Sequence, residues 1–238
     1  MKSLLIVIPT YNEASIIKES LLRLESFIKN NLSDVKTTII VSDNASQDDT
    51  RAVVREVSLH TPSVQLHEIP LKGKGIAIKS AWEKFGDAYD AVMFMDADLA
   101  VDLAALPSMI ALIDSHDAVI ANRYHAHSST KRSLLRRTAS RIFRFLMRSV
   151  LTSNVSDFPC GCKMVKSSVA LEMLPYIKND QWFFDSELVY RLERAQKSIA
   201  QLPVTWKDRA SATDSKVSVF KVGREYIREI LRLRSENK

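Results

Sequence analysis

Short strand-like runs of apolar residues alternate with longer segments of helical periodicity along the first half of the chain. The runs cover residues 4–8, 38–42, 64–69, 91–95 and 118–121. Between them, apolar residues recur every three or four positions, which is the spacing of a helix that buries one face. Strands and helices that alternate with short connections form a parallel sheet with right-handed crossovers. The pattern therefore predicts a doubly wound, mostly parallel α/β fold.

The second half of the chain breaks this rhythm at residues 122–160 and then resumes it. Strands are expected near residues 162–165 and 199–204, and helices around residues 184–195 and from about Val219. No repeat, low-complexity segment or linker divides the sequence. Its 238 residues are enough to bury one large core without disulfides or a structural metal. We therefore expect a single domain.

Two acidic residues follow the most apolar of these runs. Asp96 and Asp98 come directly after residues 91–95, with Ala97 between them. Residues i and i+2 of an extended chain point to the same side, so both carboxylates can face one cation. In open α/β sheets, ligands bind beyond the carboxyl ends of the strands, where these acids lie. The alternative interpretation is a helix cap and a solvated acid ahead of a helix that begins near Leu103.

Other polar segments are expected at the same edge of the sheet. Residues 9–13 (Pro-Thr-Tyr-Asn-Glu) follow the first strand, and Asp43 ends the second. Residues 72–75 (Lys-Gly-Lys-Gly) open a helix, where backbone amides and two ammonium groups can hold a phosphate; an exposed basic turn is the alternative. The motif G-x-G-x-x-G is not met, because the second of these glycines is followed by residues 76–78 (Ile-Ala-Ile). The glycine pattern thus argues against a dinucleotide-binding domain.

Positive charge is concentrated in one segment of the chain. The net charge is +6, and no acid occurs between Asp117 and Asp157. The basic side chains of this segment are Arg123, Lys131, Arg132, Arg136, Arg137, Arg141, Arg144 and Arg148. Such an asymmetry predicts an anionic partner: nucleic acid, a phosphorylated substrate or an acidic membrane surface.

Two basic amphipathic helices are expected, at about residues 133–150 and 219–235. Such helices suit a membrane interface, or they bury their apolar face in the protein and leave the arginines in water. The basic segment lacks the stacking aromatics and motifs of nucleic-acid readers, so a membrane surface is favoured over nucleic acid. No segment approaches about 18 uninterrupted apolar residues, so we expect no membrane-spanning helix.

Several motifs together give the chain a family resemblance. The first set is residues 7–13 (VIPTYNE), 41–50 (VSDNASQDDT), 72–75 (KGKG), 95–99 (MDADL) and 121–124 (ANRY). The second set is residues 157–163 (DFPCGCK), 182–188 (WFFDSEL) and 206–208 (WKD), with Ser215 and Lys216. The chain resembles the inverting family 2 glycosyltransferases of the GT-A fold, and among them the polyprenyl-phosphate (dolichyl-phosphate) sugar synthases. The second set resembles the dolichyl-phosphate glucosyltransferase branch more than the mannosyl branch.

The resemblance implies a donor site in residues 1–121 and an acceptor site in residues 122–238. The residues implied for the nucleotide sugar are Pro9, Tyr11, Glu13, Asp43, Lys74 and Asp96. It also implies that Asp96 and Asp98 hold Mg²⁺ or Mn²⁺ on the donor diphosphate, and oxygen ligands suit both ions. Mannosyl members commonly carry a glutamine two residues after the second aspartate. Here that position is Ala100, which makes a mannose donor less expected.

The acceptor class decides which further residues the chemistry needs. A phosphate acceptor is already anionic and needs cations to place it, for which Arg123, Arg136 and Arg132 or its neighbour Lys131 are candidates. A hydroxyl acceptor needs a general base, and Asp185 and Glu187 lie where other members carry one. The alternative for these two acids is an ordinary helix N-terminus. The candidate catalytic residues are Asp98, Arg123 and Asp185.

These expectations combine into one hypothesis. The chain is a metal-dependent inverting glycosyltransferase that moves a hexose, with UDP-glucose as the favoured donor, onto a polyprenyl or dolichyl phosphate. It works at the cytoplasmic face of a membrane, held peripherally by the lipid surface or by a membrane-protein partner. One alternative is a family 2 enzyme with a sugar-hydroxyl acceptor in glycan or polysaccharide assembly. The other is a non-catalytic module that binds nucleotide sugars or membranes.

Overall fold

The structure is a computed structural model that describes residues 1–131, 143–147, 149–207 and 219–236. Its strands are β1 (Ser3–Thr10), β2 (Lys36–Asn44), β3 (Val64–Ile69), β4 (Ala91–Met95), β5 (Ala118–Asn122), β6 (Ser129–Lys131), β7 (Cys162–Lys166), β8 (Ile199–Pro203) and β9 (Thr205–Lys207). Its helices are α1 (Ala14–Asn31), α2 (Thr50–His60), α3 (Lys74–Phe85), α4 (Leu106–Ile113), α6 (Ser167–Met173), α7 (Phe184–Arg194) and α8 (Val219–Ser235).

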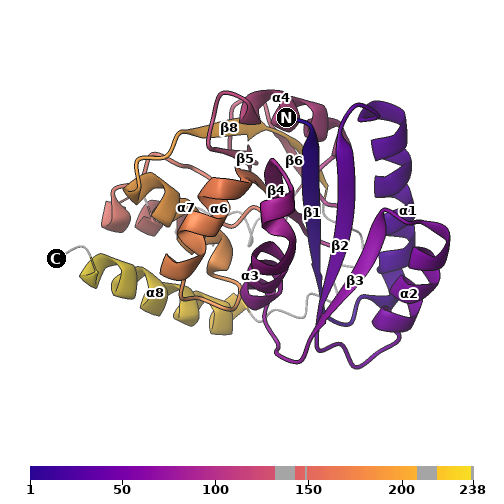
Figure 1. The fold of residues 1–238 in the computed structure, drawn as a ribbon. Helices are drawn as coiled ribbons and strands as arrows, with labels where there is room; N and C mark the ends of the chain where they lie inside the picture. The colour runs from indigo at the N-terminus through magenta and orange to yellow at the C-terminus, as the bar shows by residue number, and fades with distance from the viewer. Residues whose placement is uncertain (132–142, 148, 208–218, 237–238) are drawn as a thin grey trace.

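A seven-stranded sheet runs through the middle of the described part of the chain, in the order β3-β2-β1-β4-β7-β5-β8. All neighbouring strands are parallel except β7, which is antiparallel to both β4 and β5. The predicted doubly wound, mostly parallel α/β fold is therefore confirmed. Because the parallel strands run the same way, β1, β2 and β4 end at one edge of the sheet, at the bottom of Figure 1. The antiparallel β7 begins at that same edge.

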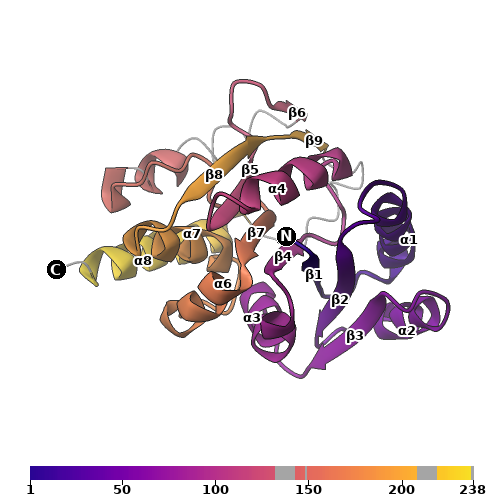
Figure 2. The same ribbon diagram turned by 45° about the horizontal axis from the view of Figure 1, so that its top comes forward.

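Helices cover both faces of the sheet (Figure 2). Alternate residues of β1 face opposite sides, as expected for a strand buried on both faces. Leu4, Ile6 and Ile8 pack with α1, α2 and α4, whereas Leu5 and Val7 pack with α3, α6 and α7. This double cover explains why the central strands are continuous apolar runs.

The described parts of the two predicted amphipathic helices pack against one another and the body of the protein, but they leave Phe145, Ile227 and Leu231 more than half exposed. The second is α8, with the predicted bounds. Of the first, residues 143–147 and 149–151 are helical, and residues 132–142 lie outside the described part. The aromatic ring of Phe143 lies 4.9 Å from that of Tyr226, and Met147 and Leu233 are fully buried in the same apolar cluster. Within the described residues, no helix has the length and apolar character needed to cross a bilayer.

A small second sheet, formed by β6 and β9, was not predicted. Its strands have three residues each and are mostly polar, so neither leaves an apolar run in the sequence. β9 also pairs with the loop after β4, because the amide of Asp102 donates to the Thr205 carbonyl and that of Lys207 to the Ala100 carbonyl. These bonds bring Trp206 next to the Asp96–Asp98 loop.

Candidate active site

The loops after β1 and β2 are fastened to each other by hydrogen bonds. The amide of Asn12 donates to Ser46 Oγ over 2.9 Å, and the amide of Glu13 donates to Thr50 Oγ1 over 2.8 Å. In return, the amide of Gln47 donates to Asn12 Oδ1 over 2.7 Å. Both loops thus form one rigid rim at the carboxyl edge of the sheet.

Asp43 offers an unsatisfied acceptor beside this rim. Its side chain is fully buried, and its Oδ1 accepts from the amide of Ser46 and lies 3.3 Å from Arg51 Nε. Within the described residues, no donor reaches its Oδ2. A buried carboxylate oxygen without a donor is costly, so this atom suits an N–H group of a bound ligand. Nearby, Lys72 Nζ donates to the Tyr11 hydroxyl over 2.6 Å.

Asp96 emerges at the end of β4, partly exposed. Its amide donates to the Gly161 carbonyl over 2.9 Å, and its Oδ1 lies 2.7 Å from Lys74 Nζ. The carboxylate rests directly on Gly161, where a Cβ would lie 1.8 Å from Asp96 Oδ2. Position 161 therefore has to be glycine for this carboxylate to hold its place.

Asp98 is held in a setting that disfavours its charge. Its Oδ1 accepts from the amide of Ala100 over 3.1 Å. Burial, followed by the negative charge of Asp96 and more weakly that of Glu13, raises the pKa of Asp98 from 3.8 to about 6. A cation placed between Asp96 and Asp98 would relieve this repulsion.

Asp96 and Asp98 fit a divalent cation shared with a diphosphate. Among the described residues, no three His, Cys, Asp or Glu side chains gather into a metal site. Two carboxylates suffice, because Mg²⁺ is commonly bound by one or two carboxylates, substrate phosphates and water. The interpretation of Asp98 as a helix cap is wrong. Its side chain accepts from the amide of Ala100, and it is Asp102 that caps the next helical turn.

Lys74 lies between two carboxylates in the interior of the site. Its Nζ lies 2.7 Å from Asp96 and 2.6 Å from Asp185. Burial opposes its charged form, but Asp185 and Asp96 outweigh burial and raise the pKa of its ammonium group. Three amides at the start of α3 are already engaged, because that of Gly73 donates to Asn44 Oδ1 and those of Gly75 and Ile76 donate to carbonyls of the protein, so these three do not cradle a phosphate.

Asp185 is buried beside Lys74 and does not cap α7. The N-cap residue of α7 is Phe183, and no side chain caps it. Asp185 Oδ2 accepts from Lys74 Nζ, while no donor in the described part of the chain reaches its buried Oδ1. Burial raises the pKa of Asp185 even though Lys74 and Lys163 oppose the shift. Asp185 thus lies in the first turn of α7, as the helix-terminus interpretation expects, but the expected capping role is wrong.

Arg123 lies on the other side of Asp98, held by a buried carboxylate. Its Nε and Nη2 each donate to Asp157 over 2.8 Å, and its amide donates to the same carboxylate over 2.7 Å. The guanidinium carbon lies 5.8 Å from the centre of the Trp206 ring. A small pocket of about 70 Å³ is lined by Asp96, Asp98, Arg123, Gly161 and Trp206.

The structure thus brings together most of the predicted site residues. Asp96, Asp98, Lys74, Asp185 and Arg123 form one polar cluster, and Asp43 lies on the rim. Lys131 ends β6, and the acceptor candidates Arg132 and Arg136 lie outside the described residues. The predicted basic turn at residues 72–75 is exposed at Lys72 but buried at Lys74.

Two further charged residues support the site and were not predicted. Lys163 in β7 is fully buried, and its ammonium group donates to the carbonyls of Phe158 and Cys160. It thereby fixes the loop that carries Gly161 beneath Asp96. Burial lowers the pKa of Lys163. Two features of the sequence could have pointed to these residues. Lys163 lies inside an otherwise apolar strand, and Asp157 is the acid that ends the acid-free segment.

Comparisons with known proteins identify the family. Residues 5–174 match the model of glycosyl transferase family 2. The chain belongs to this family. It is 26% identical to the glycosyltransferase AglD of Haloferax volcanii, with 91% of this chain and 34% of that protein covered. It is also 26% identical to a dolichyl-phosphate beta-glucosyltransferase of Dictyostelium discoideum, with 96% and 73% covered. The chain thus spans about a third of the first relative and about three quarters of the second.

The fold also agrees with solved structures of glycosyltransferases. Glucosyl-3-phosphoglycerate synthase from Mycobacterium tuberculosis, in complex with Mn²⁺, UDP and glucosyl-3-phosphoglycerate, superposes with a TM-score of 0.67. The alignment covers 98% of this chain and 80% of that chain at 16% identity. At this identity the likeness shows the fold alone, which is the GT-A fold that the motifs predicted.

Proposed function

We propose that this chain transfers glucose from UDP-glucose to a polyprenyl phosphate with the help of a divalent metal ion. The observation that carries the proposal is the small pocket whose lining brings Asp96 and Asp98 together with Arg123. Two carboxylates suit the cation of a donor diphosphate, and a fixed guanidinium suits an anionic acceptor. The named relatives include dolichyl-phosphate beta-glucosyltransferases, which supports this acceptor class.

The donor half of the proposal uses the rim and the two acids. Asp43 Oδ2 would accept the ring N–H of a uracil base, which ends its isolation from donors. Asp96 and Asp98 would hold Mg²⁺ or Mn²⁺ on the diphosphate. When bound, the ion neutralises charge that develops on the leaving nucleotide. Lys74 holds Asp96 in place for this task through their 2.7 Å contact.

The acceptor half needs no general base. A phosphate monoester is anionic near neutral pH, so one of its oxygens can attack the anomeric carbon of the sugar directly. The bond from that carbon to the diphosphate breaks, UDP leaves with the electron pair, and the anomeric configuration inverts. Arg123 would place the acceptor phosphate against the donor, because Asp157 fixes the plane of its guanidinium.

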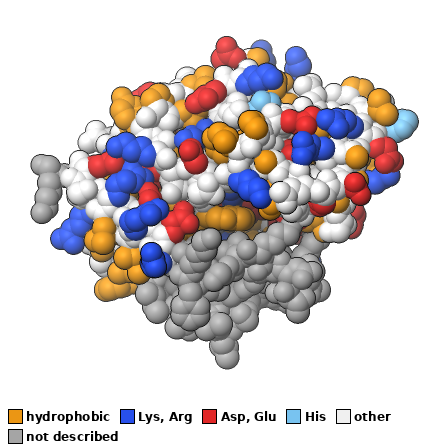
Figure 3. All heavy atoms as spheres, turned by 90° about the horizontal axis from the view of Figure 1, so that it is seen from below, with side chains coloured by type: hydrophobic (Ala, Val, Ile, Leu, Met, Phe, Trp, Pro, Cys, Tyr) orange, Lys and Arg blue, Asp and Glu red, His pale blue; other side chains and the backbone are white. Residues whose placement is uncertain are grey.

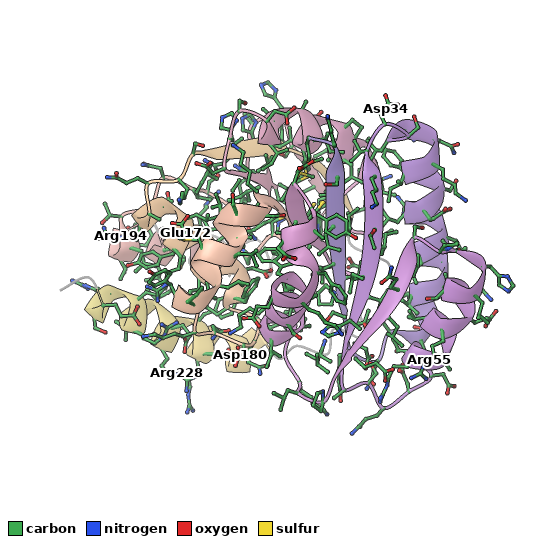
Figure 4. All side chains as sticks on the ribbon, in the orientation of Figure 1. Asp34, Arg55, Glu172, Asp180, Arg194 and Arg228 are labelled. Carbon is green, nitrogen blue, oxygen red and sulfur yellow. The ribbon has the colours of Figure 1, made fainter. Side chains whose placement is uncertain are left out.

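A lipid-linked acceptor calls for contact with a membrane, and the outer side of α8 has the required character. Three arginines and two large apolar residues are exposed along one arc of this helix: Arg224, Ile227, Arg228, Leu231 and Arg234. The acids Glu229 and Glu236 lie on the other side and pair with Arg232. Arg228 projects from α8 on the side where the parallel strands end (Figure 4), and basic and apolar side chains mix over this region in Figure 3.

Vesicle co-sedimentation tests this peripheral contact. We expect the chain to bind vesicles with anionic lipid, and salt to weaken the binding. Ile227→Asn combined with Leu231→Asn should reduce binding, because both side chains are more than half exposed on α8. Leu59→Asn is the matched control, since Leu59 is 80% exposed on α2. Binding that ignores both anionic lipid and salt would contradict this part of the proposal.

A hydroxyl acceptor is the second candidate, and one observation favours it. Asp185 has a buried oxygen without a donor and a raised pKa, which are properties of a general base. Its ion pair with Lys74 counts against this role, because the ammonium group already holds the other oxygen. Offering the protein a polyprenyl phosphate and a lipid-linked sugar with free hydroxyls side by side, with UDP-glucose and Mn²⁺, separates the two. Product from the phosphate alone supports our proposal, and product from the sugar hydroxyl would overturn it.

A further inference from the structure

The segment of residues 177–181, which precedes α7, lies against the start of α3. The amide of Gly75 donates to the carbonyl of Gln181 over 3.2 Å, and that of Ile76 to the carbonyl of Asp180 over 3.0 Å. Gln181 Nε2 also donates to the Lys72 carbonyl over 2.9 Å. The first amides of a helix have no partner inside the helix, so these bonds fix where α3 begins.

The contact between the 177–181 segment and α3 is close enough to need glycine. A Cβ on Gly75 would lie 2.7 Å from the Asn179 carbonyl oxygen, and one on Gly73 would lie 2.2 Å from that of Asp180. Gly73 also has a φ of 150°, a conformation that other residues rarely adopt. In Figure 4, Asp180 lies beside the lower end of α3, close to α8. The two glycines of this loop therefore serve this contact.

Glu187 of α7 holds the 177–181 segment from behind. Its carboxylate is fully buried, and its Oε2 accepts from the amides of Lys178 over 3.2 Å and Asn179 over 2.8 Å. The guanidinium of Arg191 donates to its Oε1, and that of Arg232 from α8 lies 2.9 Å from its Oε2. Every oxygen of Glu187 is thus engaged, which leaves no role for it as a general base.

We propose that Glu187 is a positioning residue for the donor site and acts through the 177–181 segment. The segment fixes the first turn of α3, and that turn carries Lys74 between Asp96 and Asp185. Arg232 extends the link to α8. This inference rests on the proposed function where it treats Lys74 and Asp96 as parts of the donor site. Glu187 is itself fully buried behind the segment, so it acts through the segment.

Glu187→Gln tests the link with two readouts that need no acceptor. Glutamine keeps the shape but replaces one acceptor oxygen with a donor, so one backbone amide or guanidinium loses its partner. We expect hydrogen exchange at the amides of Gly75 and Ile76 to accelerate. We also expect calorimetry to show about tenfold weaker binding of UDP with Mn²⁺, the cost of roughly one charge-assisted hydrogen bond.

Glu193→Gln is the matched control on the same helix. Glu193 accepts from the amide of Asn154 over 3.0 Å and from the hydroxyl of Ser153, which belong neither to the 177–181 segment nor to α3. This variant should lose a similar amount of stability yet leave UDP affinity and exchange at Gly75 and Ile76 unchanged. A purely structural role for Glu187 predicts the same behaviour from both variants.

Arg232→Gln provides a milder test if Glu187→Gln does not fold. It removes the pair to α8 and keeps the bonds from Lys178 and Asn179, so it should accelerate exchange at Gly75 and weaken UDP binding less. Exchange and UDP affinity that match Glu193→Gln in both variants would overturn the inference. If the unmodified chain binds no UDP, the proposed donor fails, while amide exchange still decides whether Glu187 positions α3.

Discussion

Asp98→Asn should make the metal-free protein more stable while it destroys the metal site. Burial and the neighbouring charge of Asp96 raise the pKa of Asp98 from 3.8 to about 6. A carboxyl group whose pKa rises on folding destabilises the folded state. The destabilisation is absent below the pKa of the unfolded state, grows as the pH rises toward the pKa of the folded state, and is complete above it. At about 1.4 kcal/mol for each tenfold change in proton affinity, the cost at pH 8 is at most about 3 kcal/mol. Asparagine removes this cost and still offers an oxygen to the amide of Ala100.

Thermal unfolding between pH 4 and pH 8, with and without Mn²⁺ and UDP, measures this effect. Each kcal/mol corresponds to about 2–4 °C for a domain of this size. Without metal, Asp98→Asn should melt several degrees above the unmodified chain at pH 8 and at the same temperature near pH 4. With Mn²⁺ and UDP, only the unmodified chain should gain stability, because ligands stabilise the state that binds them.

The effect of Asp98→Asn needs a control substitution at a neighbouring aspartate. Asp102→Asn is the control, since Asp102 caps the next helical turn by accepting from the amide of Ala104, and asparagine caps equally well. Asp102→Asn should leave the dependence of the melting temperature on pH unchanged, both without ligands and with Mn²⁺ and UDP. The reasoning is refuted if Asp98→Asn melts below the unmodified chain at pH 8 without metal. It is also refuted if that variant keeps its full stabilisation by Mn²⁺ and UDP.

Three further substitutions probe the surroundings of this acid. Gly161→Ala should weaken Mn²⁺–UDP binding at least about tenfold in calorimetry, because its Cβ would displace the Asp96 carboxylate; Gly223→Ala, which meets no atom within 4 Å, should leave binding intact. Lys74→Met should cost about 3–5 kcal/mol in urea unfolding, because it leaves the buried Asp185 carboxylate without its ion-pair partner; an unchanged midpoint would contradict the ion-pair assignment. Arg123→Lys cannot reproduce the two parallel bonds to its buried carboxylate, so the KM for polyprenyl phosphate should rise about tenfold while UDP affinity stays constant; equal losses would argue against its acceptor role.

Local sequence patterns sufficed for the sheet and for the residues at its edge. The apolar run of residues 91–95 is local, and it forms β4 as expected. The extended conformation expected for Asp96 and Asp98 is wrong, because Ala97 and Asp98 lie in a turn in which the amide of Leu99 donates to the Asp96 carbonyl. The α8 helix was predicted with its bounds because apolar residues recur along it at helical spacing. An apolar face that holds Ile227, Ile230 and Leu231 together is wrong as a guide to burial, because packing against the rest of the protein buries Ile230 and leaves Ile227 and Leu231 exposed.

The parts of the site that the sequence did not reveal depend on partners far apart in the chain. Lys74 and Asp185 are 111 positions apart, and periodicity carries no information about such a pairing. Asp185 therefore looked like a helix cap or a base, and it is a buried ion-pair partner. The same holds for Glu187, whose position in a first helical turn hides its contacts with the 177–181 segment and with α8. The roles of both acids could therefore be assigned only from the folded structure.

Identifying the lipid product of a single reaction tests whether the chain transfers glucose to a polyprenyl phosphate. The chain is incubated with UDP-glucose, a short-chain polyprenyl phosphate and Mn²⁺, and the lipid is analysed by mass spectrometry. We expect a new lipid heavier by one hexose residue, sensitive to mild acid, and absent with Asp98→Asn. Glucose transfer is contradicted if the polyprenyl phosphate stays unchanged although the protein is shown to bind UDP-glucose. The assignment of Asp98 is contradicted if Asp98→Asn forms as much product as the unmodified chain.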